Sequence, residues 1–129
     1  MGSYTHRNLA DLDDAAAAHG AGDSFSSRFG RDALDCEHTG FALQRLAPGA
    51  TAPFAHRHEQ AEEVYVILEG GGRMLLDEEV LTVGRRDAIR VSPGVARSFE
   101  AGPEGLELLV FGPHHKNDGE ILQVQWPAA

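Results

Sequence analysis

Residues 49–74 read GATAPFAHRHEQAEEVYVILEGGGRM, and this stretch decides the fold. His56 and His58 are two positions apart, so on an extended strand both imidazoles point to one face. Glu63 follows after a polar stretch long enough for a turn, and it starts an apolar run typical of a second strand. Two imidazoles and a carboxylate that converge predict a metal site suited to zinc, iron, manganese, nickel or copper. Glu62 is the alternative ligand, because a one-residue change of register would exchange it with Glu63.

The remainder of the chain from Phe41 onward consists of short apolar runs separated by turn residues. Gly, Pro or Asp separates successive runs at about the 8–12-residue spacing of an all-β sandwich or barrel. The runs are FALQRL, VYVIL, RMLL, VLTV, AIRV and LELLVF. Gly70, Gly71 and Gly72 are predicted to form a tight reversal between two of these strands, because glycine adopts positive φ without steric cost.

The N-terminal segment carries the one helix pattern of the sequence. Residues 9–19, LADLDDAAAAH, predict a short helix with Asn8 as N-cap and Gly20 as C-terminal stop. Residues 20–27 are predicted to form a connector.

Both alternating registers of Val64–Leu68 are apolar. A strand that faces water on one side has polar residues at every second position. We therefore expect this strand to be covered on both faces, one by the barrel interior and the other by the N-terminal segment or a second subunit, and we predict a homodimer.

Composition limits the classes of function. The 129 residues suffice for one domain, and a net charge of −9 argues against a nucleic-acid partner, because phosphate binding needs clustered cations. No apolar run approaches the roughly 20 residues of a membrane span, and no basic-then-apolar signal peptide begins the chain. Cys36 is the single cysteine, which favours a reducing compartment. We therefore expect a cytoplasmic protein.

The stretch around the histidines resembles the first conserved motif of the cupins, G-x5-HxH-x3,4-E-x6-G. His56, His58, Glu63 and Gly70 fit its spacing, and Gly49 lies one residue further upstream than the pattern asks. The resemblance implies an all-β double-stranded β-helix, a jelly-roll barrel that commonly dimerises and that often binds a divalent metal through the residues matched here. It divides the chain into an arm with a short helix and the first strands (1–38), a barrel core (39–112) and a tail that packs on the barrel or a partner (113–129).

The second cupin motif, G-x5-PxG-x2-H-x3-N, is largely missing. Aligned on Gly94, its histidine falls on Arg97, its first glycine on Arg86, its proline on Ser92 and its asparagine on Ala101. The outline of strand, turn and strand survives in AIRVSPGVARSFE, but the third histidine ligand does not. Arginine stays protonated and has no lone pair to offer a metal.

Three consequences of Arg97 are open. In the first, His56, His58 and Glu63 hold a metal more weakly than a site with a third histidine would. In the second, Arg97 points into the barrel and binds a carboxylate or phosphate of a ligand. In the third, the metal is lost and a binding cavity remains. A purely structural alternative is an ion pair between Arg97 and Glu62, Glu63 or another inward acid.

Other candidates have simpler explanations. His114 and His115 would join a metal site only if the tail folded over the barrel mouth, and a solvated turn is the simpler interpretation. Cys36 is interpreted as a small packed residue or a surface thiol, and Trp126 as a packing residue.

Two functions are compatible with the sequence. The first is a metal-dependent enzyme of isomerase or dioxygenase type, in which Arg97 orients an anionic substrate group and Tyr65 donates a proton or a hydrogen bond. The second is a non-catalytic barrel that binds or senses a small molecule without metal. A structural dimerisation module ranks last, because it would fill the barrel with apolar residues in place of His, Glu and Arg.

Overall fold

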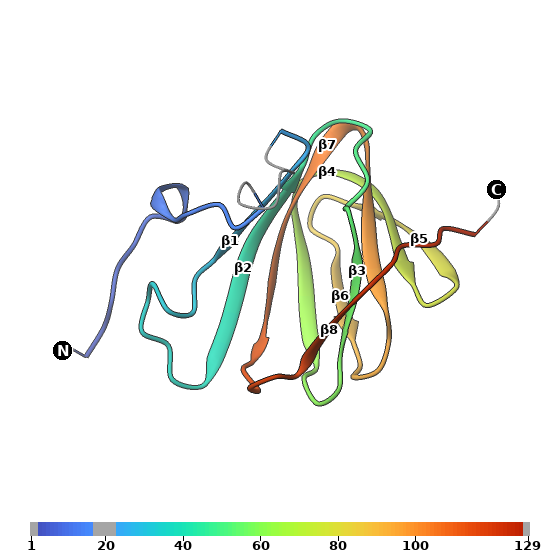
Figure 1. The fold of residues 1–129 in the computed structure, drawn as a ribbon. Coiled ribbons are helices and arrows are strands. Elements are labelled where there is room, and N and C mark those ends of the chain that lie inside the picture. The colour runs from blue at the N-terminus through green and yellow to red at the C-terminus, as the bar shows by residue number, and fades with distance from the viewer. Residues whose placement is uncertain (1–2, 17–22, 128–129) are drawn as a thin grey trace.

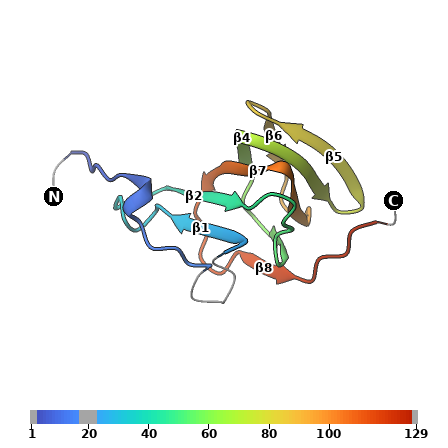
Figure 2. The same cartoon turned by 90° about the horizontal axis from the view of Figure 1, so that it is seen from above.

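The eight strands form one curled antiparallel sheet (Figure 1). A computed structural model describes residues 3–16 and 23–127. The elements are η1 (Leu9–Asp11), β1 (Phe25–Phe29), β2 (Thr39–Leu46), β3 (Ala55–His58), β4 (Glu63–Leu76), β5 (Glu79–Gly84), β6 (Ala88–Val91), β7 (Arg97–Pro113) and β8 (Gly119–Leu122). Strand order along the sheet is β1-β2-β7-β3-β8, and β4 pairs with β5, β6 and β7. Seen from above, β5 and β6 lie on one side of the barrel and β1, β2 and β8 on the other (Figure 2).

The two long strands, β4 and β7, give the sheet its curl because each pairs with several neighbours. The first part of β4 pairs with β6 and the second part with β5, while β7 pairs with β4 along most of the length of β4. The β4–β7 register shifts between Ile67 and Glu69 and again between Gly70 and Gly72, which are the irregularities that bend a strand.

The predicted tight reversal at Gly70–Gly72 is wrong, because β4 continues through all three glycines. Gly70 alone of the three has a positive φ, at 72°. A Cβ on Gly70 or Gly72 would overlap a carbonyl oxygen of β7, so these glycines permit close approach of two backbones.

The predicted helix over residues 9–19 is wrong in its described part, where a single 3-10 turn, η1, forms. Asn8 caps it as expected, since its side chain accepts a hydrogen bond from the Ala10 N–H at 2.9 Å. Leu12 already has extended backbone, with φ −80° and ψ 150°. Residues 17–19 and the predicted stop at Gly20 lie outside the described residues.

Hydrogen bonds to the next segment explain why the helix does not continue. The Asp14 carboxylate accepts from the Ala16 N–H and, across the chain, from the Ser27 N–H, each at 3.0 Å. The Ala15 N–H donates to the Ser27 carbonyl at 2.8 Å. Such side-chain and cross-chain bonds satisfy the backbone groups that a helix would have used. The connector predicted over 20–27 is accordingly wrong at its end, where β1 begins at Phe25 and pairs with β2.

The core lies inside the curled sheet and is built from alternate residues of its strands. On β4, Tyr65 and Ile67 are fully buried, whereas Val64, Val66 and Leu68 on the other face are only partly covered within the chain. The other large core side chains are Phe25, Leu46, Met74, Val83, Val91, Phe99, Leu106 and Leu108. Within the described part of the chain, no helix is long and apolar enough to cross a membrane.

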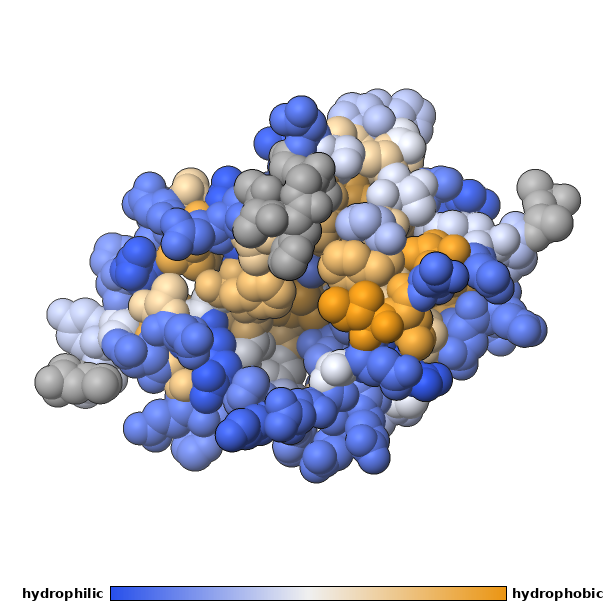
Figure 3. Space-filling model, viewed as in Figure 1, coloured by the Kyte–Doolittle hydropathy of each residue, from blue (hydrophilic) through white to orange (hydrophobic). Residues whose placement is uncertain are grey.

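On the face seen in Figure 3, hydrophilic side chains lie around the rim, and apolar ones gather over the middle of the sheet, where β3 and β8 lie. Ile121 of β8 is 72% exposed. Among the strands that the structure describes, β8 pairs with β3 alone, so it forms one end of the sheet.

Candidate functional site

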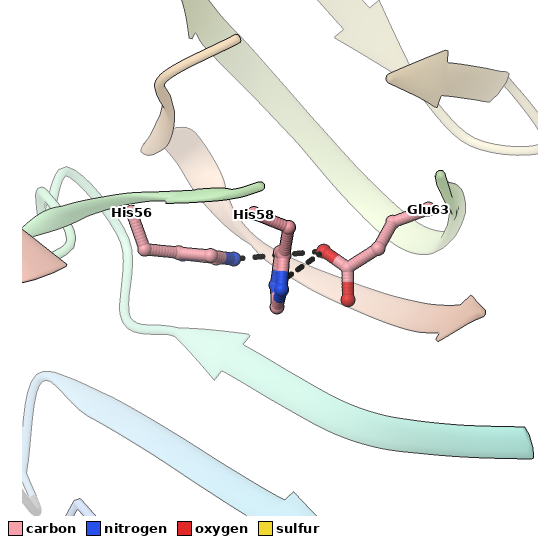
Figure 4. Close-up of side chains that lie close together, drawn as sticks. All are labelled: His56, His58 and Glu63. Atoms are coloured by element: carbon pink, nitrogen blue, oxygen red, sulfur yellow. Dashed lines mark ion pairs between the residues drawn. The ribbon is translucent and has the colours of Figure 1, made fainter. Parts of the chain in front are cut away.

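Three potential metal ligands converge where β3 and the start of β4 meet (Figure 4). His56 and His58 extend from one face of β3, and Glu63 is the first residue of β4. The Oε1 atom of Glu63 lies 3.6 Å from Nε2 of His56 and 3.3 Å from Nε2 of His58. Each residue offers a ligand atom within 4.8 Å of the others.

The spacing of these atoms suits a metal ion. Bonds of about 2.0–2.1 Å in a tetrahedral site place ligand atoms about 3.3–3.4 Å apart. Both distances to Glu63 Oε1 are within a few tenths of an ångström of that spacing. Two imidazoles and one carboxylate are the donor types that Zn²⁺ and other first-row divalent ions accept.

Glu63 is ionised and held by donors on several sides. Burial alone would raise the pKa of its carboxyl, but hydrogen bonds from His56 and His58 outweigh burial and bring this pKa far below its usual range. The Tyr65 hydroxyl donates to Glu63 Oε1 at 3.0 Å and lies 3.3 Å from His56 Nε2. Burial raises the pKa of Tyr65 well above 10, so the phenol stays neutral and donates its proton.

Glu62, the alternative ligand, lies outside this cluster. It is exposed and pairs with Arg90 of β6, with 3.3 Å between Nη1 and Oε2. The register of β4 therefore turns Glu63 toward the histidines and Glu62 away from them.

Arg97 begins β7 directly opposite His56 in the antiparallel pairing of β3 with β7. Its side chain is 0% exposed, and Nη1 lies 3.8 Å from Glu63 Oε1. Nη2 donates to the Ser92 carbonyl at 3.4 Å. Within the described residues, Nε and Nη1 have no hydrogen-bond partner. Of Glu62 and Glu63, the two acids named from the sequence as partners for Arg97, Glu63 is the one that lies beside it. In the described part of the chain, this contact leaves two guanidinium nitrogen atoms without a hydrogen-bond acceptor.

Sequence reasoning missed Asp118, which contacts the far side of the His58 ring. Asp118 Oδ2 lies 3.1 Å from His58 Nδ1. Its two oxygens also accept the Gln60 N–H at 2.6 Å and the Ala61 N–H at 3.0 Å. Only the pairing of β8 with β3 brings this aspartate to the site, and no local pattern in the sequence signals it.

The two carboxylates raise the pKa of His58. The hydrogen bond to Glu63 is the largest cause, burial opposes it, and the bond to Asp118 adds to the rise. His58 thus has a carboxylate oxygen beside each ring nitrogen.

The remaining candidates lie elsewhere. His114 and His115 are exposed in the connection before β8 and are not part of the three-residue cluster. Trp126 packs against the barrel, with the Arg73 guanidinium 5.0 Å from its ring centre. Cys36 is a half-buried free thiol.

The cluster is reached from the protein surface. A hollow of about 380 Å³ beside Arg7 and Phe29 and another of about 580 Å³ beside Asp77 include none of its residues. The side chains of His56 and His58 are 26% and 21% exposed, so small molecules in solvent can contact the imidazoles.

The curled antiparallel sheet and the His-His-Glu cluster between β3 and the start of β4 define a small jelly-roll barrel of the cupin type. Residues 42–112, more than half of the chain, match the family model described as the cupin domain. The chain belongs to the cupin family, which confirms the resemblance and the jelly-roll fold predicted from the sequence.

Relatives and solved structures agree with this assignment. An uncharacterized protein of Methanocaldococcus jannaschii is 34% identical over 83 residues, which are 62% of this chain and 66% of that protein. The crystal structure of a cupin protein from Bacteroides fragilis is similar with a TM-score of 0.72, 24% identity and coverage of 91% of this chain and 89% of that one. Oxalate decarboxylase from Bacillus subtilis matches all of this chain and 44% of its own, at 17% identity and a TM-score of 0.72. Both structural likenesses establish the fold alone.

Proposed function

We propose that this cupin binds a divalent transition metal through His56, His58 and Glu63 and a small anionic molecule beside it through Arg97. The observation that carries the proposal is the convergence of three ligand atoms next to a buried guanidinium, two of whose nitrogen atoms have no hydrogen-bond partner in the described part of the chain. Buried polar groups normally have partners. The Arg97 side chain is 0% exposed, so its guanidinium would have to turn toward the opening of the barrel for an acceptor of a ligand to satisfy Nε or Nη1.

Charge supports an anion as the ligand. Without metal, Glu63 and Arg97 cancel each other. A divalent ion adds two positive charges, of which Asp118 offsets one. The loaded site then carries one uncompensated positive charge, and a carboxylate or phosphate group would balance it.

For the isomerase-type activity that we propose, the metal would supply Lewis-acid chemistry on a bound substrate. A dioxygenase-type activity would instead need O2 as the oxidant and a redox-active ion such as iron at the same three ligands. The chain's own residues have distinct parts: Arg97 binds and orients the anionic group, and Tyr65 holds Glu63 through its hydroxyl. That hydroxyl is already donated to Glu63, so direct contact between Tyr65 and substrate would require it to exchange partners.

A non-catalytic binding or sensing barrel is the second candidate. It is favoured by Arg97 itself, which stands where the second cupin motif has a histidine and which lies 3.8 Å from Glu63. In that case an anion would bind without metal.

Elemental analysis tests the metal. Protein purified without chelator or added metal is compared with the His56→Ala/His58→Ala variant. We expect near-stoichiometric metal in the native chain and loss of it in the variant. Absence of metal from both, even after reconstitution, would reject the metal-dependent function and leave the binding barrel.

Calorimetric titration tests the anion. Malonate and its neutral diamide are titrated with and without Zn²⁺ into the native chain and Arg97→Leu. We expect the native chain to bind malonate but not the diamide, and to bind malonate more tightly when Zn²⁺ is present. Arg97→Leu should bind malonate more weakly than the native chain does. Equal binding of malonate by both proteins would reject the role of Arg97.

We also propose a cytoplasmic homodimer. The half-exposed apolar side chains of Val64, Val66 and Leu68 support the dimer, since a partner subunit would complete their burial. Light scattering coupled to size exclusion gives the mass that tests it, and a monomer at micromolar concentration would contradict it.

A further inference from the structure

Asp118 has an environment that surface aspartates lack. It lies directly before β8, its side chain is 2% exposed, and the N–H groups of Gln60 and Ala61 donate to its two oxygens. The third polar contact is His58 Nδ1 at 3.1 Å.

The direction of that third hydrogen bond follows from chemistry. An ionised carboxylate only accepts hydrogen bonds. Backbone N–H groups that donate to both oxygens of Asp118 favour its ionised form. The proton between the two groups therefore resides on Nδ1 of His58. In the neutral ring, Nε2 then keeps its lone pair on the side that faces Glu63.

Strand pairing holds Asp118 in this place. Across the β3–β8 ladder, His58 is opposite Gly119, the residue after Asp118. On the outer face, Arg57 and Glu120 form a two-pronged ion pair at 3.1 and 3.2 Å. Both β8 and Asp118 lie beyond residues 42–112, the part of the chain that the cupin family model matches.

We infer that Asp118 is a positioning residue, which fixes His58 as the Nδ1–H tautomer and thereby presents the Nε2 lone pair to a divalent metal. The inference rests on the proposed metal function. Carboxylates that accept the second N–H of a metal-binding histidine set its tautomer and ring orientation in this way.

Without Asp118 the proton has a competing acceptor. Nε2 of His58 lies 3.3 Å from Glu63 Oε1, so an Nε2–H tautomer gains a hydrogen bond there. That tautomer has no lone pair to give a metal from Nε2. Loss of Asp118 should therefore change both the tautomer and the metal affinity.

The test uses Asp118→Ala, with Asp118→Asn as a variant of the same size, and Asp87→Asn as the matched control. Asp87 also accepts a backbone N–H, from Gly84 at 2.8 Å, but has no part in the cluster. Long-range ¹H–¹⁵N NMR at about pH 9 reads the tautomer of His58 in metal-free protein. Competition with a chromogenic chelator gives the Zn²⁺ affinity, and amide spectra report whether the turn at Gln60 and Ala61 stays folded.

We expect Nδ1–H in the native chain and in Asp87→Asn, and a shift to Nε2–H in Asp118→Ala. Zn²⁺ affinity should fall about 10–100-fold in Asp118→Ala and remain native in the control. Should the alanine variant fail to fold, the asparagine variant serves the same comparison, since its amide offers one acceptor oxygen where the carboxylate offered two.

The test separates failure of the proposed metal function from failure of the role of Asp118. If the native chain takes up no Zn²⁺, the proposed function fails, and the inference about metal presentation falls with it even where NMR shows Nδ1–H. If the native chain binds Zn²⁺ while a folded Asp118 variant binds it equally well and keeps Nδ1–H, the role of Asp118 alone is overturned.

Discussion

Arg97→Met is the perturbation that most directly tests the arrangement of the site. The substitution removes the positive charge beside Glu63 and keeps a long apolar side chain in the barrel. We expect the variant to fold, because within the described residues Arg97 gives up one long hydrogen bond, from Nη2 to the Ser92 carbonyl at 3.4 Å, and a 3.8 Å contact with Glu63, while its Nε and Nη1 have no hydrogen-bond partner. We also expect it to bind Zn²⁺ more tightly than the native chain.

The magnitude follows from one distance. Nη1 of Arg97 lies 3.8 Å from Glu63 Oε1, and carboxylate–zinc bonds are about 2.0–2.2 Å, so a bound ion lies within about 6 Å of the guanidinium. Repulsion between a double and a single positive charge at about 6 Å is about 1.4 kcal/mol in the dielectric of water and about 5.5 kcal/mol at an effective dielectric of about 20. The smaller value alone corresponds to about a tenfold change in Kd.

Chelator competition at low ionic strength, where screening is weak, measures this effect. The matched control is Arg90→Met, which removes an exposed arginine paired with Glu62 outside the cluster. We expect at least about tenfold tighter Zn²⁺ binding in Arg97→Met and little change in the control. Equal or weaker binding in a folded Arg97→Met would refute the reasoning, because an ion bound at Glu63 cannot escape a charge so close.

Three further outcomes follow from the same contacts. Tyr65→Phe removes a buried donor to the Glu63 carboxylate, and denaturant titration should show a loss of about 1.5–3 kcal/mol in unfolding free energy; an unchanged midpoint would contradict that bond. Gly70→Ala should destabilise the fold more than Gly49→Ala, since both positions have positive φ but only the first would press a Cβ onto a backbone carbonyl; equal melting temperatures would count against the close approach. The pKa of His58 is raised above its ordinary 6.5, so its charged form stabilises metal-free protein below that pH, and this stability is lost as pH rises through the folded-state pKa. Unfolding free energy of chelator-treated protein should therefore fall above about pH 6.5, a trend that His58→Gln should abolish.

The sequence predicted best what depends on local spacing. Two-residue periodicity placed His56 and His58 on one face of a strand, and the apolar run after Glu63 marked the start of β4. The same register turned Glu62 outward to Arg90. These features depend on neighbours within a few residues, so a linear pattern contains them.

The errors arose where distant segments decide local structure. Alanines after Asp14 favour a helix, but the Asp14 carboxylate binds the Ser27 N–H, thirteen residues away. Glycine suits both a reversal and a close approach of two backbones, so the sequence could not separate these roles at Gly70. Asp118 reaches His58 only because β8 pairs with β3, a pairing between segments some sixty residues apart.

Arg97 connects the missing histidine of the second motif with the proposed ligand. With His58 protonated, the metal-free cluster is neutral, because Glu63 and Asp118 offset His58 and Arg97. A divalent ion displaces the proton from His58 and raises the total by one charge. An anion at Arg97 would remove that excess, so metal and anion should each favour the binding of the other. On this account the arginine weakens the metal site in isolation and makes occupancy depend on the anionic ligand.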